Sequence, residues 1–417
     1  MLRGYLIIVL VMLTSFIDGC GKSEPAGVVT LKVLDAPDGS GAWKALIEEF
    51  GKTNSEIKIE LVEGPASTDS REDIYARSFM TGQSIYDLVY MDIMWTPKFA
   101  SAGWVIPLDD LFPPEEQAKF VPGNLAGYKY QGKSYGVPLT SGTGMLLYRR
   151  DILEANNLKP PETFTDLVEI ATKLQNPPEL YGFVFQGMQY EGLICAFLEI
   201  LWGMGGDLID ENNNVLIDRP EAIEALTWLC DVVNRYKLTP PDITKYKEEE
   251  ARRVFQEGHS IFMRNWPYAW NLAQADDSPI KGKVGIVPMV HKQGKKSVGC
   301  LGGWGFGISR FTPHKEAAWK FIKFVTSTEG QKIMSFKFAA PPSRHNLFND
   351  PDILKANPHY PELYQIVLAG RPRPSHPAYA RISDILQVYI SSALVEQETP
   401  ESALKKAAQE IRALLTK

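Results

Sequence analysis

The chain has 417 residues, with 44 Lys and Arg against 50 Asp and Glu, which gives a net charge of −6. Hydrophobic residues make up 44% and charged residues 23%, a composition that excludes disordered, collagen-like and fibrous proteins. The length is sufficient for two or three domain-sized cores. Because a polyanion is bound by a basic surface, the acidic balance argues against nucleic acid as a partner.

The first twenty residues have the pattern of an export signal. Arg3 precedes an uncharged apolar run over residues 5–17, which is shorter than the roughly 20 residues of a membrane-spanning helix. Residues 17–20, Ile-Asp-Gly-Cys, resemble the bacterial lipobox, although Asp18 departs from its small neutral residues. We expect a lipoprotein-type signal peptide over residues 1–19, a lipidated Cys20, a tether over residues 20–27, and an exported, membrane-anchored protein facing the periplasm or outer surface. The alternative is an ordinary signal peptide with an incidental Cys.

The remaining cysteines are Cys195, Cys230 and Cys300. An odd number leaves at least one free thiol, and their spacing matches neither a CxxC pair nor a zinc site. The sequence leaves open whether any two of them pair.

The predicted elements alternate between strands and helices from the first residues of the body. We expect strands at 28–34, 57–62 and 87–91, with helices at 43–50 and 73–80. Further helices are expected at 165–174, 190–201, 220–236, 244–256, 315–327 and 401–416, and further strands at 144–148, 182–186, 260–263, 283–288 and 305–309. This alternation predicts an α/β fold with mostly parallel sheets, whose ligands bind beyond the carboxyl ends of the strands.

Two glycine-containing motifs do not support nucleotide binding. Residues 127–134 match the phosphate-loop pattern GxxxxGK[ST], but strand-like residues flank both sides, so we predict a hairpin turn at 131–133. Residues 303–307, Gly-Trp-Gly-Phe-Gly, lack the GxGxxG spacing of a dinucleotide site. The sequence predicts no cofactor.

Motifs of hydrolytic enzymes are also missing from the sequence. The six histidines form no HxH or HExxH pair, and no serine lies in a GxSxG motif, so neither a metal site nor a nucleophilic serine is predicted. A spatial pair of carboxylates that hydrolyses glycosides stays open, because fifty acidic residues always offer candidates.

Three segments carry side chains suited to a sugar. Residues 265–270, Asn-Trp-Pro-Tyr-Ala-Trp, form the densest aromatic cluster, and flat rings pack on the C–H faces of sugars. Residues 302–304, Gly-Gly-Trp, let the backbone approach a ligand closely. Residues 371–374, Arg-Pro-Arg-Pro, hold two guanidinium groups in a stiff segment. The alternative interpretations are the start of a core helix for the first segment and ordinary surface loops for the others.

Several segments together resemble the extracellular sugar-binding proteins of ABC importers, and among them the trehalose/maltose-binding proteins. The resemblance spans about residues 28–415, and its most specific segments are 90–95, 99–104, 186–192, 264–270, 275–279, 301–304 and 371–374. It implies two α/β lobes of the periplasmic-binding-protein type that close on a sugar in the cleft between them. We expect lobe 1 to comprise residues 28–138 and 289–338, and lobe 2 to comprise residues 139–288 and 339–417.

The resemblance also implies which residues bind the ligand. Asp92 matches a carboxylate that bonds hydroxyls, and Arg373 matches a hydroxyl-binding arginine. Trp266 and Tyr268 match an aromatic platform, with Gly303 and Trp304 as the second wall. The remaining expected ligand-binding residues are Arg71, Ser70, Thr143 and Glu191.

Two departures from the family pattern affect the choice of ligand. Thr140 and Gly142 stand where the trehalose/maltose pattern has a Tyr and an Asp, and the loop at 35–41 lacks an expected glutamate. A site that loses hydroxyl acceptors changes which sugar it holds. We therefore expect a non-enzymatic, monomeric protein that delivers a trehalose, sucrose, maltose or glucosylglycerol-like glycoside to the transmembrane subunits of an ABC permease. The alternatives are a secreted glycoside hydrolase and a sugar sensor for a membrane receptor.

Overall fold

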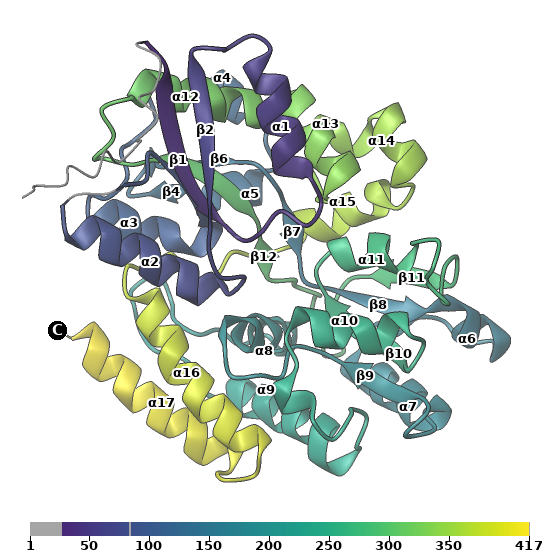
Figure 1. Cartoon of the computed structure of the whole chain (residues 1–417). Helices are drawn as coiled ribbons and strands as arrows, with labels where there is room; N and C mark the ends of the chain where they lie inside the picture. Colours follow the sequence, from purple (N-terminus) through teal and green to yellow (C-terminus); the bar gives the residue numbers. More distant parts are fainter. Residues whose placement is uncertain (1–26, 83–84, 417) are drawn as a thin grey trace, which may run out of the picture.

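The computed structural model describes residues 27–82 and 85–416 and consists of two α/β lobes (Figure 1). The two-lobed α/β class predicted from the sequence is confirmed. The predicted signal peptide, Cys20 and residues 21–26 of the predicted tether lie outside the described residues.

The first lobe is built on a five-stranded sheet with strand order β2-β1-β3-β13-β6. β1 pairs in parallel with β2 and β3, whereas β13 is antiparallel to both β3 and β6. The strands are β1 (Val29–Asp35), β2 (Ile57–Glu63), β3 (Leu88–Asp92), β6 (Val137–Pro138) and β13 (Trp304–Ile308). The helical elements along this part of the chain are α1 (Ala42–Gly51), α2 (Thr68–Met80), η1 (Ile93–Trp95), α3 (Thr96–Ser101), α4 (Pro114–Gln117), α5 (Pro122–Gly127), α12 (Lys315–Val325) and α13 (Thr328–Lys337).

The second lobe is built on a four-stranded sheet with strand order β11-β8-β10-β9. Only β9 and β10 are parallel, since β8 runs antiparallel to β10 and β11. The strands are β8 (Met145–Arg149), β9 (Tyr181–Val184), β10 (Ser260–Asn265) and β11 (Val284–Val287). The helical elements in the rest of the chain are α6 (Arg150–Ala155), α7 (Phe164–Leu174), α8 (Glu191–Met204), α9 (Pro220–Cys230), η2 (Asp231–Arg235), η3 (Ile243–Lys245), α10 (Glu248–Gln256), α11 (Tyr268–Ala273), η4 (His345–Asn349), α14 (Pro351–Ala356), α15 (Tyr360–Leu368), α16 (Tyr379–Leu394) and α17 (Pro400–Leu415). The expectation of mostly parallel sheets is therefore wrong for this lobe. In the first lobe it holds only for β1, β2 and β3.

A short antiparallel pair of strands joins the lobes where the chain passes between them. β7 (Gly142–Thr143) pairs with β12 (Leu301–Gly302), between the two larger sheets (Figure 1). The segment that leads to β12 has its buried contacts with the second lobe. Met289 and Val290 lie in the core of the second lobe, and the backbone N–H of Cys300 donates a hydrogen bond to Glu199 of α8. Met289, Val290 and Cys300 thus pack with the second lobe, whereas residues 292–296 between them are exposed.

The phosphate-loop match forms the predicted hairpin. β4 (Lys129–Tyr130) and β5 (Lys133–Ser134) pair in antiparallel fashion. The turn residues Gln131 and Gly132 both have positive φ, at 48° and 79°, which is the geometry of a two-residue hairpin turn. No helix begins directly after this loop, so it does not form a phosphate site.

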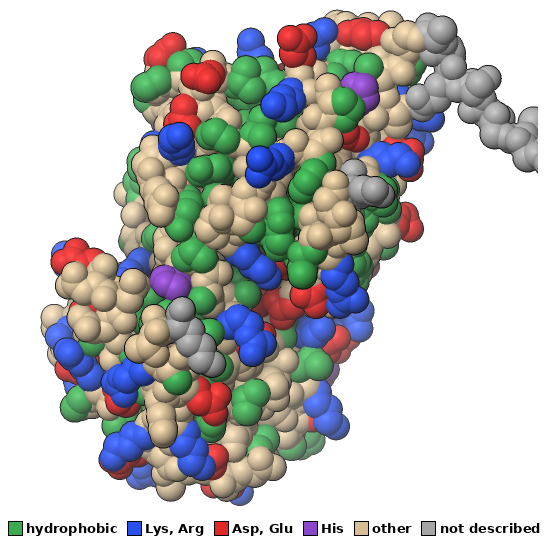
Figure 2. Space-filling model, turned by 90° about the vertical axis from the view of Figure 1, so that its left-hand side faces the viewer, with side chains coloured by type: hydrophobic (Ala, Val, Ile, Leu, Met, Phe, Trp, Pro, Cys, Tyr) green, Lys and Arg blue, Asp and Glu red, His purple; other side chains and the backbone are tan. Residues whose placement is uncertain are grey.

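On the side shown in Figure 2, acidic and basic side chains are interspersed, and the basic ones form no continuous face there. Within the described residues, none of the helices has both the length and the apolar character to cross a membrane.

Candidate ligand-binding site

A cavity of about 460 Å³ is lined by residues of both lobes. Most of the predicted site residues meet there, although they are spread from α2 to the segment after α15. The eight predicted residues that line it are Arg71, Asp92, Glu191, Trp266, Tyr268, Gly303, Trp304 and Arg373.

The structure places the other two predicted residues outside the cavity lining. Ser70 is exposed on α2. Thr143 is completely buried in β7, where its hydroxyl donates to the carbonyl of Cys300 at 3.2 Å. Its hydroxyl therefore contacts the backbone that leads into β12.

The wall from the second lobe is the turn that follows β10. Asn265 accepts a hydrogen bond from the backbone N–H of Trp266, and Pro267 starts α11, so that Trp266 and Tyr268 both face the cavity. The Trp266 ring packs on the buried Arg264 guanidinium, 4.3 Å from the ring centroid. Trp270 of this aromatic cluster does not line the cavity. It lies within α11, as the alternative of a core helix predicts.

The polar groups of Trp266 and Tyr268 already donate hydrogen bonds within the protein. The indole N–H of Trp266 donates to Glu248 at 3.4 Å, and the hydroxyl of Tyr268 donates to Glu249 at 2.8 Å. These hydrogen bonds hold two carboxylates at the cavity, and carboxylates are acceptors for ligand hydroxyls.

The wall from the first lobe is formed by Trp304 and Arg71. The Arg71 guanidinium lies 4.1 Å from the centroid of the Trp304 ring and is paired with Asp35. Burial raises the pKa of Asp35, and Arg71 offsets part of that effect. This wall therefore presents a guanidinium stacked on an indole.

Gly303 keeps the backbone close to the cavity. Its φ is 145°, and a Cβ atom there would lie 2.7 Å from the Thr140 carbonyl and 2.8 Å from the Asn124 side chain. Only glycine fits this position.

A buried arginine links the two lobes. Arg373 donates to Asp92 at the end of β3 at 2.7 Å and to Glu191 at the start of α8 at 2.9 Å. Its side chain is 3% exposed. Glu191 also accepts hydrogen bonds from Tyr379 and Ser383, so this carboxylate is held in place from three sides. The pair Asp92 and Arg373 is thus both part of the cavity lining and a contact between lobes.

A second acidic side chain faces Glu191 from α2. Burial, together with the negative charges of Glu191 and Glu72, raises the pKa of Asp69 to about 7. The backbone N–H of Glu191 lowers the pKa in part. Carboxyl groups of α2 and α8 therefore meet beside the cavity, and one of them titrates near neutral pH.

The sequence of the chain matches the profile of the bacterial extracellular solute-binding proteins over residues 36–332. The chain belongs to this family. The family predicted from the sequence is therefore confirmed, and its members are binding proteins, not enzymes.

Relatives of this solute-binding protein match it over most of their length. A probable ABC transporter-binding protein of Deinococcus radiodurans is 30% identical, covering 88% of this chain and 87% of the relative. A maltotriose-binding protein of Pyrococcus abyssi is 27% identical, covering 90% and 80%.

Among solved structures, maltose-bound MalE3 of T. maritima superposes with a TM-score of 0.87 at 38% identity, covering 93% of this chain and 100% of that one. A solute-binding protein of Agrobacterium radiobacter in complex with ribitol has a TM-score of 0.83 at 27% identity, covering 94% and 100%.

Sequence reasoning missed several residues of this solute-binding protein's cavity. Tyr190 and the run Lys247 to Glu250 line it, at the starts of α8 and α10. An acidic run at a helix start is usually solvated, so the sequence does not mark these residues as part of a ligand site. Thr140 and Gly142, which replace the Tyr and Asp of the family pattern, do line the cavity.

Proposed function

We propose that this solute-binding protein captures a small neutral glycoside, such as a disaccharide or a glucosylglycerol-like compound, and delivers it to an ABC permease. The observation that carries the proposal is the two-walled cavity of about 460 Å³, with aromatic rings on each wall and hydrogen-bonding groups between them. Rings that pack on C–H faces, with polar groups placed for hydroxyls, suit a carbohydrate.

Two buried donors in the cavity lining support a ligand rich in hydroxyls. The Nε atoms of Arg71 and Arg373 are buried and, within the described part of the chain, have no hydrogen-bond partner. A buried polar group without a partner costs roughly 1–3 kcal/mol. A ligand hydroxyl that reaches either N–H would remove part of this cost.

Five of the charged side chains that line the cavity are paired within the protein. Arg71 is paired with Asp35, and Arg373 with Asp92 and Glu191. Glu249 is paired with Arg252 at 2.7 Å. A charged solute would have to compete with these internal pairs, whereas a sugar only adds hydrogen bonds to them.

The names and bound ligands of the relatives also support a sugar or polyol as the ligand class. The Pyrococcus relative carries maltotriose in its name, and the solved relatives hold maltose and ribitol. We further infer that Cys20 carries the lipid anchor, that the protein acts as a monomer at the outer face of the membrane, and that residues near β7 and β12 form the hinge between the lobes.

Isothermal titration calorimetry tests the proposal directly. Trehalose, sucrose, maltose, glucosylglycerol and ribitol are titrated into the full mature chain, with an amino acid and a polyamine as controls. We expect one glycoside or polyol to bind with a stoichiometry of one. Heat from the amino acid or polyamine alone would overturn the assignment to sugars.

A further inference from the structure

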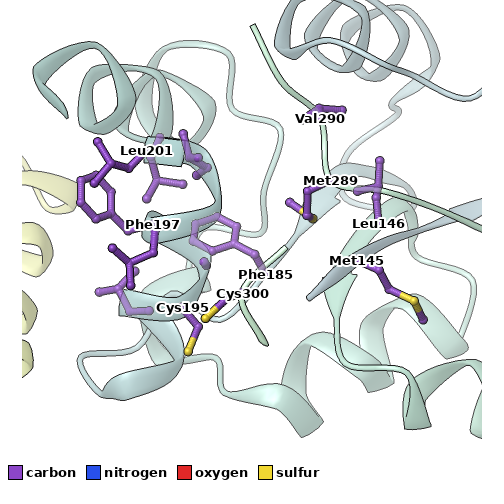
Figure 3. Packing of buried hydrophobic residues seen from close by; sticks show 14 of the residues in the cluster. Met145, Leu146, Phe185, Cys195, Phe197, Leu201, Met289, Val290 and Cys300 are labelled. Atoms are coloured by element: carbon purple, nitrogen blue, oxygen red, sulfur yellow. The ribbon is translucent and has the colours of Figure 1, made fainter. Parts of the chain in front are cut away.

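Two of the cysteines touch each other inside the second lobe. Cys195 lies on α8 and Cys300 directly precedes β12. The Cys195 thiol donates to the Glu191 carboxylate and the Cys300 thiol to the Leu301 carbonyl, each at 3.9 Å. Figure 3 shows the two sulfur atoms side by side among the apolar side chains of this core. Both residues are buried, at 2% and 0% exposure. A contact between two thiols 105 positions apart in the sequence is a product of the tertiary structure.

The backbone around Cys300 is fixed against α8 by an ion pair. Glu199, one helical turn after Cys195, accepts the backbone N–H of Cys300 at 3.1 Å. Glu199 is itself paired with Arg264 at 2.6 Å, and neither side chain is exposed. Since a buried charge that loses its partner is strongly destabilising, this arrangement keeps the segment of Cys300 against the helix of Cys195.

The third described cysteine has a different environment. Cys230 ends α9 and is half-buried. Burial and the charge of Asp231 raise its pKa, and no thiol contributes to that shift. Residues 27–82 and 85–416 therefore contain one pair of neighbouring thiols and one separate thiol, Cys230, which serves as an internal control.

We propose that Cys195 and Cys300 form a disulfide bond when the protein is exported. The inference rests on the extracellular location of the family and on the contact between the two sulfurs, and it does not depend on which solute is bound. Exported proteins meet an oxidising environment in which disulfides form and persist.

The bond forms by thiol–disulfide exchange. One cysteine thiolate attacks the disulfide of a small thiol or an oxidoreductase and releases one thiol. The second cysteine then attacks the mixed disulfide and releases the other thiol. The protein loses two protons and two electrons, and the attacked disulfide is reduced to two thiols.

The reaction belongs to the folding of the exported chain. In the folded structure, the neighbouring Cys300 thiol and burial together raise the pKa of the Cys195 thiol, and a protonated thiol is a poor nucleophile. We therefore expect the bond in chains that fold outside the cytoplasm and free thiols in chains that fold in a reducing cytoplasm.

The bond would tie the cavity wall to the hinge. Cys195 lines the cavity together with Glu191 and Gly192 of the same helix, and Cys300 leads into β12 between the lobes. The cross-link would fix α8 relative to this strand without crossing from one lobe to the other, so lobe closure stays free.

Mass spectrometry of the full chain tests the proposal. The protein is exported from a bacterial host, denatured with excess maleimide in the absence of reductant, and digested. We expect a linked peptide pair containing Cys195 and Cys300 that is lighter by two hydrogens than the two free peptides, and maleimide on Cys230. After reduction, Cys195, Cys230 and Cys300 should all react.

The same chain produced in a reducing cytoplasm serves as the matched reference. It should react with maleimide at Cys195, Cys230 and Cys300 after denaturation and unfold at a temperature lower by about 5 °C or more, the scale expected for a cross-link closing about 100 residues. A Cys230→Ser variant should keep the linked peptide pair. Maleimide on Cys195 and Cys300 in the exported, unreduced protein would overturn the proposal, as would a linked pair that includes Cys230.

Discussion

At the scale of single residues, Trp266 is the side chain of the cavity whose loss should be easiest to interpret. One face of its ring lies on Arg264, and the residue lines the cavity. If a sugar packs on the ring, Trp266→Ala should weaken binding by about 1–3 kcal/mol, the scale of burying a large apolar side chain. Calorimetry with the ligand found for the unaltered protein measures this change.

Trp228→Ala is the matched control for this substitution. Trp228 is also half-buried, but it packs on Phe164 with ring centroids 4.7 Å apart and does not line the cavity. It should lower the free energy of unfolding and leave the affinity unchanged. Equal affinities for both variants would return Trp266 to a purely structural role.

Arg373 should matter for both stability and binding. Replacing it by Met leaves Asp92 and Glu191 buried without their shared counter-charge, and breaking a buried pair from one side costs about 3–5 kcal/mol. We expect Arg373→Met to lower the free energy of unfolding by that order and to weaken ligand binding as well. Denaturant titration and calorimetry measure the two effects.

Arg371→Met is the matched control, because Arg371 forms an ordinary surface ion pair. Its side chain is 46% exposed and is paired with Asp207. Because surface ion pairs contribute about 0–1 kcal/mol, Arg371→Met should change neither quantity much. A comparable loss in both variants would contradict the assignment of a special role to Arg373.

At the scale of elements, the starts of α2 and α8 bring two acidic residues together. The pKa of Asp69 is raised to about 7 by burial and by the charges of Glu191 and Glu72, while Asp384 of α16 acts in the same direction. Lys98 faces this group from α3 through its ion pair with Glu72. The folded protein therefore binds the Asp69 proton more tightly than the unfolded chain, whose value is 3.8.

The sign of the pH dependence follows from that difference. Between pH 4 and about 7 the folded state holds more protons at Asp69, so its contribution to stability is lost as the pH rises. We expect the unfolding temperature of the unaltered protein to fall over this range more steeply than that of Asp69→Asn. Calorimetric scans at several pH values test this, and parallel curves for the two proteins would contradict it.

The elements that sequence reasoning found are those with a local signal. β1, β2 and β3 alternate with helices of clear periodicity, and the turn after β10 is marked by its density of aromatic rings. α16 was not predicted, and it packs against both α8 and α17, so its apolar positions spread over more than one face. β13 pairs antiparallel to β3 because of the direction in which the chain returns from the other lobe. A local sequence pattern does not contain this information.

The residues of the candidate site also differ in whether a local sequence pattern identifies them. Trp266, Tyr268, Trp304 and Arg373 were found from motifs that carry their own chemistry. Glu248 and Glu249 were missed because their role comes from tertiary contacts with the two aromatic side chains after β10. The buried ion pairs were missed for the same reason, since Asp35 and Arg71 belong to different elements.

At the scale of the whole molecule, the ligand should act as the contact that holds the lobes together. One wall of the cavity, with Trp304, comes from the first lobe, and the other, with Trp266 and Tyr268, comes from the second. A ligand shifts a conformational equilibrium only by its difference in affinity for the two states. Because contacts with both walls exist only when the lobes are closed, the closed state should gain the whole of one wall's binding energy.

Small-angle X-ray scattering tests this closure in solution. We expect the radius of gyration to fall when the bound glycoside is added and to stay constant with a sugar that gives no heat in calorimetry. Trp266→Ala should require more glycoside for the same fall, because one wall then contributes less to the closed state. A radius of gyration that is the same with and without saturating ligand would contradict closure and would leave a preformed cavity as the binding state.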